Sequence, residues 1–253
     1  MRRVLVTGAS RGIGRAVAVA FATHGDTVAV HHASSREDAE QTLRQLAGSG
    51  HALVAGDLAD PDAAQDIAER ACRALGGVDV LVNNAAVAPG ESNSHAVAEV
   101  SYAAWQQAWR RMLDVNLLGS ANLTYAVARR LIDRGSPGSI VNVGSRGAFK
   151  GEPTYPAYGA SKAALHAFGQ SMAVALAPHG ITVASVAPGF VATERQADQL
   201  NGTGGDTLRA ESPFGRVGTP DGVVAAVLYL ASPQAAWSSG AVLDLNGASY
   251  LRT

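Results

Sequence analysis

Two residues on one predicted helix have the types and spacing needed for acid–base chemistry. Tyr158 and Lys162 are four positions apart, so both side chains project from the same helix face. A phenol has an ordinary pKa of about 10, which makes it too weak an acid to cycle at neutral pH. A nearby ammonium favours the phenolate and lowers that pKa. The pair could therefore give a proton to an oxygen of a bound molecule, or take one from it.

Two further polar residues could complete such a centre. Ser145 closes a predicted strand just upstream of the pair, and Asn116 is a polar residue amid apolar helix positions. A hydroxyl placed like that of Ser145 would hydrogen-bond an oxygen on which negative charge develops. Taken singly, the four residues could be a core tyrosine, a surface lysine, a cap and a satisfied buried amide. Their occurrence together favours a catalytic centre.

A glycine-rich turn near the amino terminus could bind phosphate. Gly8, Gly12 and Gly14 follow the first predicted strand in a G-x-x-x-G-x-G spacing and open the first predicted helix. Glycines allow a sharp turn and let a diphosphate approach amides at a helix N-terminus, where the helix dipole favours anions. The alternative is a tight turn without a ligand. Its placement between strand and helix favours a dinucleotide site.

Polar residues also end the third and fourth predicted strands. Asp57 stands in Gly56-Asp57-Leu58, and Asn83 begins Asn83-Asn84-Ala85. Open α/β sheets bind ligands at the carboxyl ends of their strands, so these residues are candidate cofactor contacts. Asp and Asn also cap turns and helices, and that interpretation stays open.

The residues after the second predicted strand favour NADP(H) over NAD(H). An acidic residue there would bind a ribose 2′-hydroxyl and repel a 2′-phosphate. The stretch from His31 through His32 to Arg36 contains no acid before Glu37, and Arg11 can reach the same region from the glycine turn. Arginine pairs well with phosphate through its planar fork of donors. The alternative is that both arginines are solvated surface charges.

Parallel strands joined by helices would position these residues. Short β-rich runs alternate with longer helical patterns along the whole chain, which predicts an α/β doubly wound sheet. No linker, repeat or charge block divides the chain, so we expect one domain over residues 1–253. The predicted strands are 3–7, 27–31, 52–55, 78–82, 139–143, 181–186 and 241–245. The predicted helices are 14–24, 37–46, 61–75, 97–118, 121–132, 158–176 and 221–230.

Composition excludes several classes of protein. The net charge of −1 indicates no general affinity for nucleic acid or anionic membranes. Cys72 is the only cysteine, so neither an intrachain disulfide nor a cysteine-rich metal site can form, and the seven histidines show no metal-ligand pattern. No apolar run reaches the roughly 20 residues of a membrane-spanning helix. We expect a cytoplasmic protein without a catalytic metal.

At this point the chain resembles the short-chain dehydrogenase/reductase family over essentially its whole length, and most closely its 3-oxoacyl-(acyl carrier protein) reductase-like members. The resemblance rests on the glycine turn, Asn83-Asn84-Ala85, Asn116, Ser145, Tyr158-x-x-x-Lys162 and Pro188-Gly189-x-x-x-Thr193. It implies a single-domain Rossmann-type fold with a seven-stranded parallel sheet, and a homotetramer or homodimer. It also implies that Asn116, Ser145, Tyr158 and Lys162 are catalytic, with Asn116 holding a water in a proton relay.

The resemblance also implies a set of cofactor contacts, in which Lys162 grips the nicotinamide ribose and Asp57 binds the adenine. The set is Gly8, Ser10, Arg11, Gly12, Ile13, Gly14, His32, Asp57, Leu58, Asn83, Ala85, Tyr158, Lys162, Pro188, Gly189, Val191 and Thr193. Residues of about 190–215 would form a substrate lid. Ala148, Phe149, Tyr155 and Phe190 would form a partly apolar wall, although each could equally be ordinary packing.

Two departures from the family pattern bear on the substrate. Ala86 stands where glycine is usual, and its methyl could tighten the cofactor cleft. His179 stands where carrier-protein reductases place a basic side chain. The leading hypothesis is an NADPH-dependent reductase of 3-oxoacyl or related carbonyl compounds. The alternatives are an alcohol, sugar or polyketide-type dehydrogenase and a non-catalytic nucleotide-sensing scaffold, but scaffolds typically lose the four catalytic residues.

Overall fold

Seven parallel strands form one sheet in the order β3-β2-β1-β4-β5-β6-β7. The structure is a computed structural model that describes residues 1–252, without the side chain of Arg195. This confirms the predicted fold class. The strands are β1 (Arg3–Val6), β2 (Thr27–His32), β3 (Ala52–Ala55), β4 (Val80–Asn83), β5 (Gly138–Val143), β6 (Ile181–Pro188) and β7 (Val242–Leu245).

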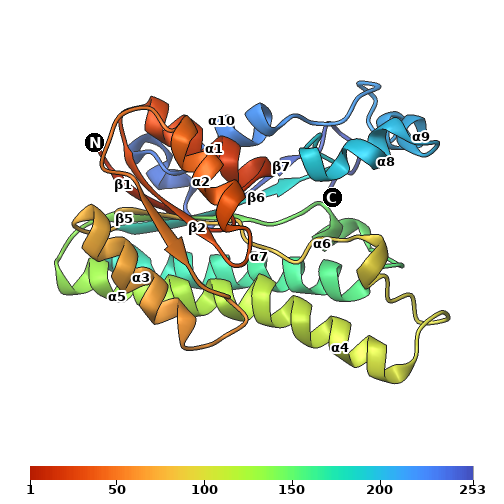
Figure 1. Cartoon of the computed structure of the whole chain (residues 1–253), viewed down its shortest axis with the longest axis horizontal. Helices are drawn as coiled ribbons and strands as arrows, with labels where there is room; N and C mark the ends of the chain where they lie inside the picture. Colours follow the sequence, from red (N-terminus) through yellow and green to blue (C-terminus); the bar gives the residue numbers. More distant parts are fainter. Residues whose placement is uncertain (253) are drawn as a thin grey trace.

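Helices cover both faces of the sheet (Figure 1). On one face lie α1 (Gly12–Thr23), α2 (Arg36–Gln45) and α10 (Pro220–Leu230). On the other lie α3 (Ala63–Leu75), α4 (Tyr102–Leu113), α5 (Ser120–Asp133) and α7 (Pro156–Leu176). Successive strand residues point to opposite faces, so Val4 and Val6 pack in the α1 and α10 layer while Leu5 packs in the α3 and α5 layer.

One helical rod differs from its prediction. The sequence pattern predicts a helix over 97–118, but α4 begins at Tyr102, where the Ser101 side chain caps it by accepting a bond from the Ala104 N–H at 3.3 Å. The rod then passes through a π-helical turn, Asp114–Gly119, and runs directly into α5. Asn116 lies inside this wider turn, and such turns occur frequently at functional sites.

The segment predicted as a lid contains two short helices. They are α8 (Ala197–Asn201) and α9 (Gly205–Ala210), and Figure 1 shows them near the chain's carboxyl terminus, beyond the ends of β6 and β7. A four-residue helix, α6 (Gly147–Lys150), follows β5 and leads toward α7. The loops after β5 and β6 therefore carry ordered elements on the side of the sheet where the strands end.

Candidate active site

The carboxyl ends of β1, β4, β5 and β6 bring the predicted site residues to one edge of the sheet. The chain leaves β1 for β2 and β3 on one side and returns to β4 on the other side of β1. Ligands of open α/β sheets bind at such a reversal of strand order. Gly8, Asn83, Ser145 and Pro188 all lie at this edge, each at or just after the end of its strand.

The glycine turn packs so closely against the segment after β4 and against itself that Gly8 and Gly14 have no room for a side chain. Gly8 and Gly12 have φ values of +60° and +57°, which favour glycine. A Cβ on Gly8 would lie 2.8 Å from the Cα of Ala85, and one on Gly14 would overlap the carbonyl oxygen of Gly8. The turn opens α1, whose first amides point toward the sheet edge. This cradle fits a dinucleotide diphosphate.

Polar bonds hold the turn in place. The Asn84 amide donates to the carbonyls of Thr7 and Gly8 at 2.9 and 3.1 Å. The Thr7 hydroxyl accepts from the backbone N–H of Asn84 and of Ala85 at 2.9 and 3.0 Å. These bonds connect the end of β1 with the end of β4, so the glycine turn and the Asn83-Asn84-Ala85 segment form one unit.

His31 anchors the turn from the other side, a role that was not predicted from the sequence. Its Nδ1 accepts from the Gly8 N–H at 3.2 Å, so its Nε2 is the donor to the Gly56 carbonyl at 3.0 Å. Burial lowers the pKa of His31 to about 4, which keeps the ring neutral and preserves this tautomer. A histidine at a buried position of a strand was the available signal.

Lys162 lies on α7 beneath the predicted acid. Its side chain is buried and donates from Nζ to the Val143 carbonyl at 2.8 Å. The Nζ atom is 5.9 Å from the centre of the Tyr158 ring. Burial lowers the pKa of Lys162 to about 8, so the ammonium is still the main form at neutral pH. The structure thus places a positive charge beside a phenol.

Asn116 reaches the same helix through a serine. Its Nδ2 donates to the Ser161 hydroxyl at 3.0 Å, and Ser161 donates to the Tyr158 carbonyl at 2.8 Å. The Asn116 Oδ1 accepts from the Val87 N–H at 2.8 Å. Asn116 therefore joins the π turn, the loop after β4 and the first turns of α7. No role for Ser161 was predicted from the sequence.

Ser145 follows β5 at the start of α6. Its Oγ accepts from the Gly147 N–H at 3.0 Å, which leaves the hydroxyl hydrogen available for donation. His166 packs beneath this loop, stacked on Phe149 with ring centroids 5.3 Å apart. A Cβ on Gly144 would overlap the His166 imidazole. The backbone next to Ser145 is thus held against α7, the helix that carries Tyr158.

The residues predicted to bind the adenosine part of the cofactor lie at the end of β2, after β3 or just before α1. His32 is buried at the end of β2, and Arg11 is exposed at the N-cap of α1. Asp57 pairs with Arg111 at 3.0 Å and accepts from the Ala59 N–H. Partial burial would raise the pKa of Asp57, but these two donors together lower it. Leu58 packs against Gly119.

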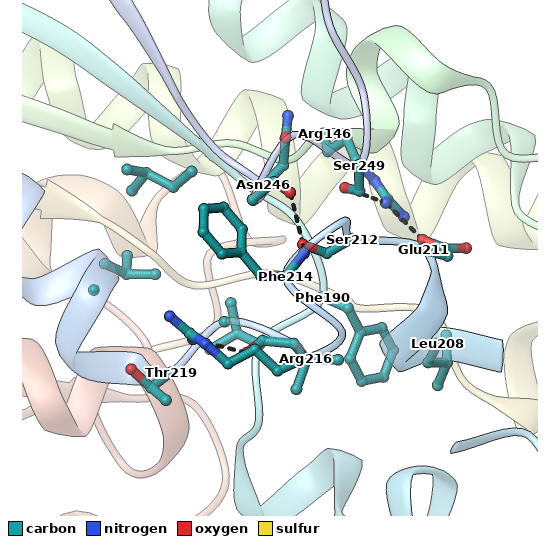
Figure 2. Close-up of a pocket in the computed structure, with 17 residues that line it drawn as sticks. Arg146, Phe190, Leu208, Glu211, Ser212, Phe214, Arg216, Thr219, Asn246 and Ser249 are labelled. Atoms are coloured by element: carbon teal, nitrogen blue, oxygen red, sulfur yellow. Dashed lines mark hydrogen bonds and ion pairs between the residues drawn. The ribbon is translucent and has the colours of Figure 1, made fainter. Parts of the chain in front are cut away.

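The end of the predicted lid forms part of the wall of a cavity of about 250 Å³ (Figure 2). Arg146 lines it and binds Glu211 of the predicted lid segment at 2.6 Å and the Ser249 hydroxyl at 2.7 Å. Lys150 binds the same Glu211 at 3.1 Å. Phe190 and Val191 line this cavity, whereas Thr193 lies over Gly12. None of the four predicted catalytic residues lines this cavity, although Arg146 directly follows Ser145.

Among the described residues, no group of three or more His, Cys, Asp or Glu residues is arranged to hold a metal ion. Within residues 1–252, no helix has both the length and the apolar character needed to cross a membrane.

Comparison with known proteins identifies the family. The family model described as short chain dehydrogenase matches residues 2–203. The chain is 37% identical to the L-rhamnose 1-dehydrogenase (NAD(P)(+)) of Sphingomonas sp. strain SKA58 over 99% of this chain and 96% of that protein. It is 34% identical to the 3-oxoacyl-[acyl-carrier-protein] reductase of Vibrio cholerae over 98% and 96% of the two chains.

Solved structures agree with the sequence relatives. A short chain dehydrogenase from Burkholderia cenocepacia J2315, solved in complex with NADP, has a TM-score of 0.86 at 31% identity and covers 98% of this chain and 97% of its own. A glucose/ribitol dehydrogenase-type protein from Brucella melitensis has a TM-score of 0.88 at 28% identity, covering 99% and 97%. The chain belongs to the short-chain dehydrogenase family of NAD(P)-dependent oxidoreductases that act on alcohol and carbonyl groups.

Proposed function

We propose that this enzyme interconverts a carbonyl compound and an alcohol with NADP(H), using Tyr158 as the general acid and base. The observation that carries the proposal is the buried Lys162 ammonium, 5.9 Å from the Tyr158 ring. An ammonium desolvated at this position favours the phenolate form of the tyrosine. Structural roles alone would not require a buried cation, because burying one is costly to folding.

The proposed mechanism gives a defined task to each of the four residues Asn116, Ser145, Tyr158 and Lys162. A nicotinamide cofactor, when bound, would supply or accept the hydride. The Ser145 hydroxyl donates to the substrate oxygen as negative charge develops. The Tyr158 hydroxyl transfers its proton to that oxygen, and the C=O bond becomes C–OH. Lys162 stabilises the phenolate that remains, and Asn116 fixes the first turns of α7 through Ser161.

The residues that would bind the cofactor lie along the same edge of the sheet. The diphosphate would lie against the turn residues Gly8 and Ser10 and the first residues of α1, which are Gly12, Ile13 and Gly14. Asp57 and Leu58 would contact the adenine, and Lys162 the nicotinamide ribose. Asn83 and Ala85 would lie along the cofactor, and the segment containing Pro188, Gly189, Val191 and Thr193 would contact the carboxamide.

Replacing Tyr158 tests the acid directly. Tyr158→Phe removes only the hydroxyl, so kcat should fall by at least about 100-fold, the usual contribution of general acid catalysis. The dissociation constant for NADPH, measured by calorimetry, should stay within about threefold of the wild-type value. A variant with near-normal turnover would assign the proton transfer to another group.

Arg11 and His32 support a preference for NADP(H), since neither repels a 2′-phosphate. The double variant Arg11→Ala/His32→Asp should lower the ratio of kcat/KM for NADPH to that for NADH by at least about tenfold. The matched control is Arg36→Ala, because Arg36 is already paired with Glu40 at 2.9 Å. If Arg36→Ala moves the ratio and the double variant does not, the 2′-phosphate site lies at α2 instead.

For the substrate, a polyhydroxylated compound such as an aldose fits the site better than an acyl chain. Two of the four predicted apolar wall residues are engaged in packing: Phe149 stacks on His166 and lies under Arg252, and Tyr155 packs against His95. Glu152 is a half-buried carboxylate in the same loop. Relatives named L-rhamnose 1-dehydrogenase, at 37% and 34% identity, also support this class.

A 3-oxoacyl thioester remains the second candidate substrate. Relatives named 3-oxoacyl-[acyl-carrier-protein] reductase match almost the full chain at 34% and 32% identity. The test is a panel of aldoses with NADP⁺ and NAD⁺, run beside acetoacetyl thioesters with NADPH and NADH. Turnover of thioesters but not of aldoses would reverse the order of the two candidates. We further propose that the enzyme works as a homotetramer or homodimer in the cytoplasm, by the family resemblance.

A further inference from the structure

A carboxylate of the predicted lid lies on the glycine turn. The Gly12 N–H donates to Oε2 of Glu194 at 3.1 Å, and Oε1 of Glu194 lies 3.5 Å from Nη1 of Arg15. Thr193 packs beside this contact, since a Cβ on Gly12 would lie 3.5 Å from the Thr193 Cγ2. A segment that is 182 positions away in the chain therefore covers the first amide of α1.

The contact has the chemistry of a bound anion. The first amides of a helix have no partner within the helix, and the helix dipole favours negative charge there. Arg15 adds a guanidinium whose side chain is only 15% exposed, anchored by bonds to the Ser10 carbonyl and the Thr42 hydroxyl. The Glu194 carboxylate thus stands where the proposed cofactor diphosphate would place its oxygens.

We infer that Glu194 sets the cofactor affinity of this enzyme by competing with the diphosphate for the N-terminus of α1. The inference rests on the proposed function. Two anions cannot share the Gly12 amide, so Glu194 must give up its bond to the Gly12 N–H when the diphosphate binds there. The free energy of that bond is subtracted from the binding free energy of the cofactor.

Displacement of Glu194 also links the cofactor site to the predicted lid. Glu194 begins a single 3-10 turn, Glu194–Gln196, that runs directly into α8. Moving the carboxylate off Gly12 therefore shifts the start of the segment that leads to α8 and α9. Loss of the charge at position 194 should consequently tighten cofactor binding while it also frees the lid from the glycine turn.

The variants Glu194→Gln and Glu194→Ala test the competition. Both remove the charge, and the glutamine keeps the size of the side chain. Dissociation constants for NADPH, NADH and inorganic pyrophosphate alone should each fall by about threefold to tenfold. This is the range expected when a charge contact at a helix terminus and a partly exposed ion pair are lost. The Glu194 side chain is 62% exposed, so neither variant is expected to impair folding.

The matched control is Asp198→Asn, which removes one negative charge from the exposed face of α8 without touching the glycine turn. Its dissociation constants should stay within about twofold of the wild-type values, because charges far apart in water are screened. Unchanged or weaker cofactor binding in both Glu194 variants would overturn the competition, and so would equally tighter binding in Asp198→Asn. Either result leaves the proposed function standing as long as the wild-type protein binds NADPH. If the wild-type protein binds neither dinucleotide, the proposed function fails, and the competition fails with it.

Discussion

The buried ammonium of Lys162 should weaken the folded state in a way that depends on pH. Burial lowers its pKa from the ordinary value of 10.5 to about 8. Below pH 8 the lysine is charged both in the folded and in the unfolded chain, and the folded state bears the full cost of burying that charge. Between pH 8 and 10.5 the folded protein loses the proton first, so the unfolded state binds more protons and stability rises with pH.

The size of this effect follows from the two pKa values. Each unit of difference is worth 1.36 kcal/mol, so the change from 10.5 to about 8 corresponds to about 3 kcal/mol. Lys162→Met removes the ionisable group but keeps an unbranched side chain of similar length. The free energy of unfolding of the wild type should therefore rise by about 2 kcal/mol between about pH 7 and pH 10, and that of the variant should not show this rise. Loss of the bond to the Val143 carbonyl adds a cost that is the same at both pH values.

Urea unfolding followed by tryptophan fluorescence measures this difference, since the chain has three tryptophans. The pair of proteins to compare is Tyr158→Phe and Tyr158→Phe/Lys162→Met, so that ionisation of the catalytic phenol does not contribute. Lys150→Met is the matched control, because Lys150 is the chain's other lysine and its side chain is 37% exposed. A stability difference for Lys162→Met that is constant from pH 7 to pH 10 would refute the cost assigned to the buried ammonium.

Two further predictions concern the supports of the Ser145 loop. Gly144→Ala should lower the free energy of unfolding by about 1–3 kcal/mol and reduce kcat, because the new Cβ overlaps the His166 ring. Adding His166→Ala should restore part of the stability and part of kcat. If the stability losses of the two single variants simply add in the double variant, the clash is contradicted. Arg146→Gln and Glu211→Gln should each cost about 1–3 kcal/mol, since each leaves a largely buried charge with fewer partners. In urea unfolding the Arg146→Gln/Glu211→Gln double variant should lose less stability than the two single variants lose together. If the two losses simply add, the side chains do not act as a pair.

Local sequence patterns predicted most of the fold, because apolar runs and helical periodicity depend on near neighbours. All seven strands fall within a few residues of their predicted positions, and the strand-to-helix turn at Gly8 is where the glycines indicated. The start of α4 was predicted too early, although Ser101 is a good N-cap residue and could have marked it. Pro61 was expected in the first turn of a helix, but α3 begins at Ala63.

The supporting contacts of the site could not be predicted in this way. His166 fits beneath Gly144, and Glu194 reaches Gly12, only because the sheet brings distant segments together. A single sequence contains no signal for such pairs. His31 was visible as a polar residue in a buried strand, but its two bonds depend on the positions of β1 and β3. The candidate site residues could therefore be named from the sequence, whereas the contacts that position them could not.

The wide turn at Asp114–Gly119 constrains the length of this chain as well as its composition. Each residue of an α-helix advances by about 100°, so one extra residue in the rod rotates α4 relative to α5 by about that angle. With this rotation, α4 packs on α7 while α5 packs on α3 and carries Leu123 into the core. Deleting a single residue from the turn would give a regular helix whose two halves could no longer both meet their neighbours. At this point of the chain, a substitution should be far easier to tolerate than a change in the number of residues.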